Sequence, residues 1–278
     1  MSRSQDVLIS KNMGILRHFV GEAWEDLAMT QIAYMTRESW AQDGTSVVPQ
    51  SAVIRKWLGK PPYIFITSDP KKFNGQISAD KEFADYIALQ PDHRQIMRTT
   101  ELQQLIRQDE RFSGTITVLH PHKQDDCELL RKLVEGNHVS RLFVIVWSPT
   151  DMVRFWLEGI GASNLGDGST RQAFDASQLE VAKCIVSEEY NGLSAGNGKA
   201  AVVQLIRAFT AHGYELRKRP WLTAYFAAGG KFRHAESISK LISEMEKGIT
   251  HRVQQRYRAE ILSVLQERLS AVPPEITQ

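Results

Sequence analysis

The clearest pattern of apolar and polar positions in this chain lies in residues 140–161. Residues 142–147 are six consecutive branched or aromatic apolar side chains, and such a run is typical of a strand buried on both faces. Ser148 then stands at the position of a helix N-cap, Pro149 at the first helical position and Asp151 in the first turn. The pattern predicts a buried strand that leads directly into a helix, which is the repeating unit of a parallel α/β sheet.

Two shorter runs of branched residues precede this unit and predict strands at residues 63–67 and 115–119. Amphipathic spacing around the strands predicts helices at residues 11–40, 49–58, 79–89, 101–109 and 124–135. Because strands and helices alternate with short connections, the sheet should be parallel with right-handed crossovers.

Beyond residue 177 the pattern contains apolar stripes at helical spacing and no strand-like run. Five helices are expected, marked by apolar residues within 179–186, 202–209, 221–228, 238–245 and 253–265. The sequence thus predicts an α/β fold with a small parallel Rossmann-like sheet and flanking helices, followed by an all-α C-terminal helical domain. We expect three parts, namely an N-terminal helical segment packed on the α/β body (residues 1–60), the α/β domain (61–165) and a basic helical domain (166–278).

Composition narrows the class of protein. Two cysteines, Cys127 and Cys184, are too few for a disulfide framework or a four-cysteine zinc site. The first 14 residues lack the apolar core of a secretory signal, and no apolar run approaches the roughly 20 residues that a membrane span needs. We therefore expect a reduced, cytoplasmic protein that does not insert into a membrane.

The formal net charge of +2 is distributed unevenly along the chain. Residues 198–278 hold 13 Lys and Arg against 7 Asp and Glu, a net charge of +6, whereas the other residues hold 21 against 25, a net charge of −4. A positive C-terminal region favours an anionic partner, either nucleic acid or an acidic protein. The alternative is that this charge meets acidic groups of the same molecule. The oligomeric state stays open.

The basic side chains of this region fall into three groups. One group precedes Trp221, one follows a Gly–Gly turn, and one begins the last predicted helix, where Arg252 and Arg256 would share a face one turn apart. Residues 221–246 also have the outline of a helix-turn-helix. The candidate nucleic-acid or anion contacts are Arg217, Lys218, Arg219, Lys231, Arg233, Arg252, Arg256 and Arg258.

Polar residues and a proline follow each of the three predicted strands. Ligands of open parallel sheets lie beyond the carboxyl ends of the strands, so Asp69, His120 and Asp151 are candidate catalytic residues that would converge on one pocket. Lys71 and Lys72 lie nearby in the sequence and could hold an anion. The alternative is that the aspartates and Ser148 only cap helices, as strand–helix loops commonly require.

Two further motifs carry less weight. His120 and His122, followed by Asp125, Asp126 and Cys127, resemble a metal cluster, but side chains two apart in an extended segment point to opposite sides, so we expect no metal site.

The segment GLSAGNGK at residues 192–199 is not a phosphate-binding loop, because Leu193 stands where the motif needs glycine and Ala200 where it needs Ser or Thr. A weaker anion site at a helix start remains an alternative there.

We therefore expect a binding or regulatory protein whose basic helical C-terminal domain contacts nucleic acid or another polyanion. Two alternatives stay open. One is an enzyme acting on a nucleotide or phosphoester at the carboxyl ends of the parallel strands. The other is a scaffold subunit of a larger assembly, for which six tryptophans would supply interface anchors. No pattern identifies a cofactor.

Overall fold

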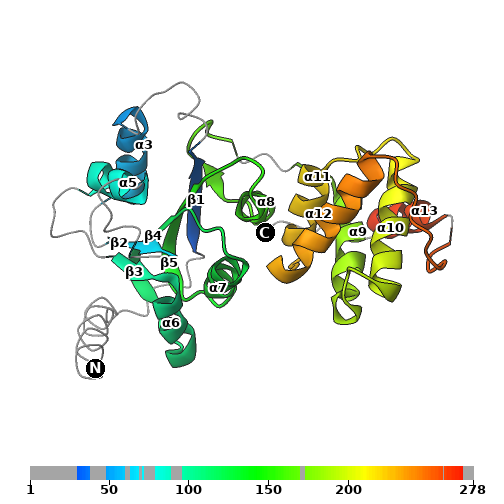
Figure 1. Cartoon of the computed structure of the whole chain (residues 1–278), viewed down its shortest axis with the longest axis horizontal. Coiled ribbons are helices and arrows are strands. Elements are labelled where there is room, and N and C mark those ends of the chain that lie inside the picture. The colour runs from blue at the N-terminus through cyan, green and yellow to red at the C-terminus, as the bar shows by residue number, and fades with distance from the viewer. Residues whose placement is uncertain are drawn as a thin grey trace. The chain divides into compact units, whose positions relative to one another are not determined.

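The structure, a computed structural model, describes residues 30–37, 48–59, 63–68, 71, 79–88, 96–169, 173–258 and 260–271. The chain divides into two compact units (Figure 1). The first consists of Met1–Val153 with Ala162–Ser169 and contains the sheet. The second consists of Arg154–Gly161 with Thr170–Gln278 and is helical.

The first unit is built on a sheet whose six described strands are all parallel. They are β1 (Gln31–Thr36), β2 (Tyr63–Thr67), β3 (Ile96–Arg98), β4 (Phe112–Leu119), β5 (Val139–Val146) and β6 (Ser163–Asn164), in the order β3-β2-β4-β5-β1-β6. On β5, Val144 lies opposite Tyr34 on one side and Val118 on the other. Residues 142–146 of β5 are at most 1 % exposed, which confirms the prediction of a doubly buried strand and of a parallel sheet, whereas Trp147, the last residue of the predicted run, follows the strand and is 54 % exposed.

Helices cover both faces of the sheet (Figure 1). On one face lie α3 (Val48–Leu58) and α5 (Ala79–Ile87), and on the other lie the short 3₁₀ helix η2 (Thr99–Leu102), α6 (Gln103–Gln108) and α7 (Gln124–Glu135). Ile54 of α3 and Phe83 of α5 pack with Met35, Phe65 and Phe143 of the strands in one buried cluster. This layered arrangement is the predicted Rossmann-like α/β fold.

The second unit is all-α in its described residues. It contains most of α8 (Met152–Gly159), then α9 (Ala176–Ser187), the 3₁₀ helix η3 (Glu189–Asn191), α10 (Gly196–Thr210), α11 (Lys218–Ala227), α12 (Phe232–Glu246) and α13 (Ile261–Ala271). The predicted apolar stripe of α10 is fully buried, and Leu205 and Phe209 are both 0 % exposed. The all-α C-terminal region is therefore confirmed. None of the described helices is long and apolar enough to cross a membrane.

Two helical predictions are wrong. Residues 31–36 form β1 rather than the end of a helix, because this short apolar run pairs with β5 on one edge and β6 on the other. Residues 251–258 are not helical, and α13 begins only at Ile261. Gly248, with φ +78°, ends the preceding helical run, and the segment after it bonds to side chains of α10 instead of to its own backbone. Arg252 and Arg256 therefore do not lie one helical turn apart.

The junction between β5 and α8 also differs from the prediction. Ser148, Pro149 and Thr150 form a turn, and the helix begins at Met152. The carboxylate of Asp151 accepts a hydrogen bond from the backbone N–H of Ser148 at 2.9 Å. The residue directly before the helix is therefore Asp151, and the predicted N-cap Ser148 lies in the turn.

Candidate anion-binding sites

Polar side chains from both faces meet at the carboxyl ends of β2 and β4. Asp80, in the first turn of α5, accepts a hydrogen bond from Oγ1 of Thr67 at 3.1 Å through Oδ2, and its Oδ1 contacts Nδ1 of His120. On the α7 side, Oγ of Ser68 donates to the carboxylate of Asp126. The chain leaves β2 toward α5 and leaves β4 toward α7, so these strand ends form the kind of switch point at which α/β sheets bind ligands.

His120 is held tightly at the end of β4. Its backbone has φ +45°, which is uncommon for a residue with a side chain, and its N–H donates to the carbonyl of Ile145 at 3.0 Å. The imidazole side chain is 10 % exposed and packs edge-on against Trp147, with 4.9 Å between the ring centroids. Its Nε2 is buried with no hydrogen-bond partner among the described residues. The Asp80 carboxylate at Nδ1 therefore fixes the orientation of the ring.

The three predicted catalytic residues have different outcomes. His120 lies at the strand ends as described. Asp151 lies at the end of the β5–α8 turn, and its carboxylate accepts a hydrogen bond from the Ser148 N–H, which closes that turn. Asp69 lies outside the described residues. That the three share a pocket stays a prediction.

The sequence cluster that resembles a metal site is split by the fold. His122 is exposed, and its Nδ1 lies 3.1 Å from the carbonyl oxygen of His120. Burial, with help from neighbouring carboxylates such as Asp126, raises the pKa of the Cys127 thiol to about 12, so the sulfur is a neutral thiol at ordinary pH. In the described part of the chain, no three His, Cys, Asp or Glu side chains are grouped to hold a metal ion.

A pocket of about 920 Å³, here called the strand-end pocket, opens beside Ser68. It is lined by Ser68, Lys71, Arg98, Thr99, Thr100, Lys123, Gln124, Asp125 and Asp126. Every one of these side chains is polar or charged. The sequence pointed to Lys71, but it missed Arg98 and Lys123, because β3 was not predicted and nothing in the local pattern places its end beside the start of α7.

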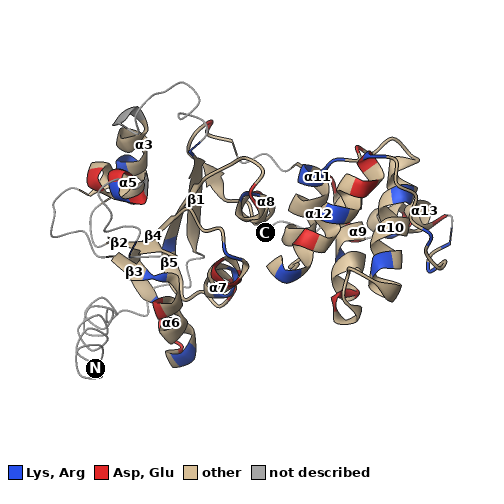
Figure 2. Cartoon of the chain, viewed as in Figure 1, with Lys and Arg blue, Asp and Glu red and all other residues tan. Residues whose placement is uncertain are grey.

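In the helical unit, three predicted anion contacts bind carboxylates of the same molecule. The pairs are Arg219 with Glu158, Lys231 with Glu189, and Arg256 with Glu188. All three carboxylate residues are buried and precede residue 198. The excess positive charge of the C-terminal region is thus partly balanced inside the unit, and Figure 2 shows basic and acidic residues interspersed on α12 and neighbouring helices.

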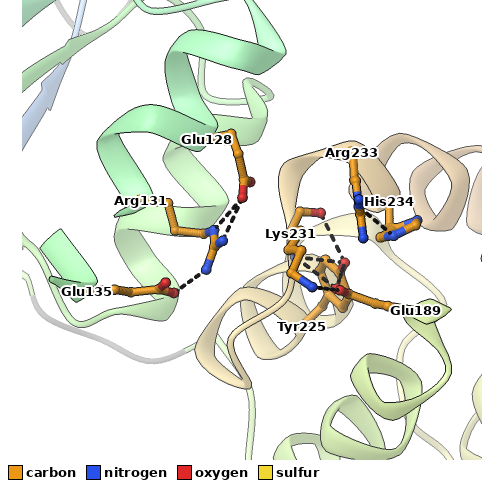
Figure 3. A network of polar contacts seen from close by, with 8 residues as sticks. All are labelled: Glu128, Arg131, Glu135, Glu189, Tyr225, Lys231, Arg233 and His234. Carbon is orange, nitrogen blue, oxygen red and sulfur yellow. Dashed lines mark hydrogen bonds and ion pairs between the residues drawn. The ribbon is translucent and has the colours of Figure 1, made fainter. Parts of the chain in front are cut away.

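Lys231 is bound within a group of hydrogen bonds around the carboxylate of Glu189 (Figure 3). Oε1 of Glu189 accepts hydrogen bonds from the Tyr225 hydroxyl at 2.5 Å and from the Lys231 backbone N–H at 2.9 Å, and Nζ of Lys231 lies 3.1 Å from Oε2. Burial acts to raise the pKa of the Glu189 carboxyl, but the bonds from Tyr225 and Lys231 outweigh it and lower the pKa. Lys231 therefore stabilises the fold at the junction of α11 and α12.

Two other predicted contacts also have partners. Arg217 lies 3.7 Å from the exposed carboxylate of Glu215, and Nε of Arg233 donates to Nε2 of His234 at 3.0 Å (Figure 3). Figure 3 also draws a separate arginine cluster of α7, in which Arg131 binds Glu128 and Glu135.

A pocket of about 510 Å³, here called the arginine pocket, lies between α10, residues 251–258 and the start of α13. Its lining residues are Gln204, Arg207, Ala208, His251, Arg252, Val253, Gln255, Tyr257, Arg258 and Ile261. Three are arginines and none is Asp or Glu. Arg252 and Arg258 were predicted as anion contacts, whereas Arg207 was missed, because a single basic residue on an amphipathic helix carries no signal of its own.

Hydrogen bonds from α10 hold the irregular segment that carries Arg252 and Arg258. The side-chain oxygen of Gln204 accepts from the backbone N–H groups of Arg256 at 2.8 Å and Tyr257 at 3.1 Å. Nη1 of Arg207 donates to the carbonyl of His251 at 2.9 Å. The arginine pocket is therefore formed by a segment with fixed backbone contacts.

The glycine-rich segment 192–199 has a packing explanation. A Cβ added to Gly198 in the first turn of α10 would lie 1.9 Å from the carbonyl oxygen of Gly192. The glycine at 198 is thus needed for close approach of two backbone segments.

Comparison of the chain with protein-family models, with curated proteins and with solved structures found no match.

Proposed function

We propose that the helical unit binds nucleic acid through the arginine pocket. The observation that carries this proposal is that Arg207, Arg252 and Arg258 line one pocket that has no carboxylate in its lining. An uncompensated group of guanidinium ions creates a positive potential that attracts phosphate groups.

Burial and pairing distinguish these arginines from the other predicted contacts. Arg219, Lys231 and Arg256 hold buried carboxylates, and using them for a ligand would remove one charged partner from each carboxylate, at a cost of about 1–3 kcal/mol each. Arg252 and Arg258 are exposed and belong to the pocket lining. At the wall of the pocket, Nε2 of His251 lies 3.4 Å from Oε2 of Glu244.

Guanidinium groups recognise phosphate geometry through paired hydrogen bonds, and phosphate contacts carry no base sequence. The proposed binding is therefore insensitive to sequence and sensitive to salt. Each phosphate neutralised on duplex DNA releases about 0.9 counterion.

The test is fluorescence anisotropy with labelled single-stranded RNA and double-stranded DNA at several salt concentrations. The double variant Arg252→Ala/Arg258→Ala should bind about a hundredfold more weakly, about tenfold for each arginine, and its salt dependence should fall by about two counterions.

The matched control is Lys240→Ala/Lys247→Ala, which removes the same charge from exposed positions outside the pocket lining. This control should bind nearly as tightly as the native protein. Equal losses in both double variants would show that only net charge matters, and no binding by the native protein at low salt would refute the proposal.

We also propose that the protein works in the cytoplasm. Cys127 and Cys184 are both free thiols, which suits a reducing compartment. Fractionation of cells that express the full chain is the direct measurement.

A further inference from the structure

The strand-end pocket lies where an α/β sheet binds small ligands. Most of its lining comes from Ser68 after β2, from residues 98–100 at the end of β3 and the start of η2, and from residues 123–126 at the start of α7. These three segments are far apart in the chain, and the parallel order of β3, β2 and β4 brings their carboxyl ends to one edge. The pocket is independent of the arginine pocket, which belongs to the other unit.

The cations of the pocket suit a phosphate group. Arg98 and Lys123 are exposed and come from different elements, and Lys71 lies on the same lining. Lys123 is the N-cap of α7, and because its ammonium group can only donate, it leaves the first backbone N–H groups of the helix without a capping acceptor. Together these groups supply charge and hydrogen-bond donors for a phosphate ester.

The acidic members of the lining have separate roles. Asp126 is only 8 % exposed and accepts the hydroxyl hydrogen bond of Ser68, so it belongs to the wall of the pocket. Asp125 is exposed on the first turn of α7. A carboxylate beside a phosphate site repels the phosphate, but it is a strong acceptor for sugar hydroxyl groups, as in dinucleotide-binding folds, where an acidic residue binds the ribose.

The remaining lining residues are also suited to a hydroxylated ligand. Thr99, Thr100 and Gln124 offer hydroxyl and amide groups that donate and accept. Ligand pockets are usually walled by apolar and aromatic side chains, and this lining has none. The pocket therefore favours a ligand rich in hydrogen-bonding groups and gives no aromatic platform for stacking a base.

From this combination we propose that the strand-end pocket binds the phosphate ester of a sugar. Arg98 and Lys123 hold the phosphate, and Asp125 accepts hydrogen bonds from the sugar hydroxyls. The same chemistry occurs in free sugar phosphates and in the ribose phosphate part of a nucleotide.

Isothermal titration calorimetry of the full chain with ribose 5-phosphate, inorganic phosphate, ribose and AMP tests the proposal. Ribose 5-phosphate should bind at least tenfold more tightly than phosphate or ribose. Lys123→Ala and Arg98→Ala should each weaken it by about tenfold, since each removes a charge-assisted hydrogen bond. The matched control is Lys132→Ala, an exposed lysine in the last turn of the same helix, and it should leave binding unchanged.

The variant Asp125→Asn distinguishes the contribution of the sugar to binding from that of the phosphate. It should weaken ribose 5-phosphate while leaving phosphate binding unchanged or stronger, because a neutral amide oxygen is a weaker acceptor for sugar hydroxyl groups than a carboxylate and no longer repels the phosphate. AMP that binds as tightly as ribose 5-phosphate would point to a free sugar phosphate, and tighter AMP would point to a nucleotide.

Three results would overturn the proposal. They are no binding of ribose 5-phosphate, phosphate alone binding as tightly as ribose 5-phosphate, and Lys123→Ala behaving as Lys132→Ala does. Chemical shifts of the amides of residues 123–126 on addition of ribose 5-phosphate locate the site independently, and unchanged shifts there would also refute it. Nucleic-acid binding by the arginine pocket is unaffected by any of these results.

Discussion

The guanidinium of Arg219 donates two hydrogen bonds to the carboxylate of Glu158, with distances of 2.9 Å from Nε to Oε2 and 3.1 Å from Nη2 to Oε1. Arg154, one turn before Glu158 on α8, donates a third at 2.8 Å. The Glu158 side chain is only 3 % exposed, whereas that of Arg219 is 52 % exposed. Arg219 thus joins the start of α11 to α8 within the helical unit and satisfies a buried carboxylate.

Replacing Arg219 with alanine should lower the free energy of unfolding of the helical unit by about 1–2 kcal/mol. The loss is moderate because Arg154 still binds the carboxylate and because the arginine is half-exposed. Urea denaturation followed by circular dichroism measures it. Arg217→Ala is the control, since its side chain is 75 % exposed and its partner Glu215 is exposed too. A stable Arg219→Ala variant with weakened nucleic-acid binding would contradict the structural role.

Replacing Gln204 with alanine should weaken nucleic-acid binding several-fold without changing the charge of the protein. The side chain holds the backbone of Arg256 and Tyr257, so its loss releases the segment that carries Arg252 and Arg258. Hydrogen exchange gives an independent readout, because the amides of Arg256 and Tyr257 should exchange faster.

The control for this variant is Gln254→Ala, whose side chain is exposed and lies outside the lining of the arginine pocket. Unchanged exchange at residues 256 and 257 in Gln204→Ala would show that other contacts hold the segment.

Replacing Gly198 with alanine should destabilise the helical unit by about 1–3 kcal/mol. The new methyl group would overlap the Gly192 carbonyl oxygen, which is backbone and cannot rotate away. Thermal unfolding measures the effect, and Asn197→Ala, at an exposed position beside it, should change stability by less than about 0.5 kcal/mol. If Gly198→Ala were as stable as the native protein, the glycine would need a different explanation.

The two cysteines should differ in reactivity. Burial raises the pKa of Cys127 to about 12, so iodoacetamide should not modify it in the folded protein between pH 7 and pH 9. Cys184 is partly exposed and should react first, although burial raises its pKa as well. Mass spectrometry of the modified peptides measures both rates, with the urea-unfolded protein as the control.

The raised pKa of the Cys127 thiol also makes the stability of the fold depend on pH. Because the pKa of Cys127 is higher in the folded state than its ordinary value of 9.0, its neutral form stabilises the fold at lower pH, and this contribution is lost as the pH rises from 9 toward 12. The alkaline loss of stability should be smaller in Cys127→Ala. An identical pH profile in that variant would contradict the assignment.

Local pattern predicted much of the fold. The strand at residues 63–67 and the helix at residues 124–135 have the predicted bounds, because a run of branched apolar residues or a continuous amphipathic stripe can be buried in only one way. The strand β1 was assigned to a helix, since six residues with mixed spacing fit either period. Its two parallel neighbours, β5 and β6, made it a strand, and they follow it by more than 100 residues.

The candidate sites depended far more on tertiary structure. Composition and charge alone identified the C-terminal region as basic, and Arg252 and Arg258 were among the predicted contacts. The local sequence does not show which cations pair with carboxylates inside the fold, because Arg219 and Arg256 bind carboxylates 61 and 68 residues away. Hydrogen bonds and ion pairs act over about 3 Å, so only chain packing decides which charges are neutralised and which, like those of Arg252 and Arg258, stay exposed at a pocket.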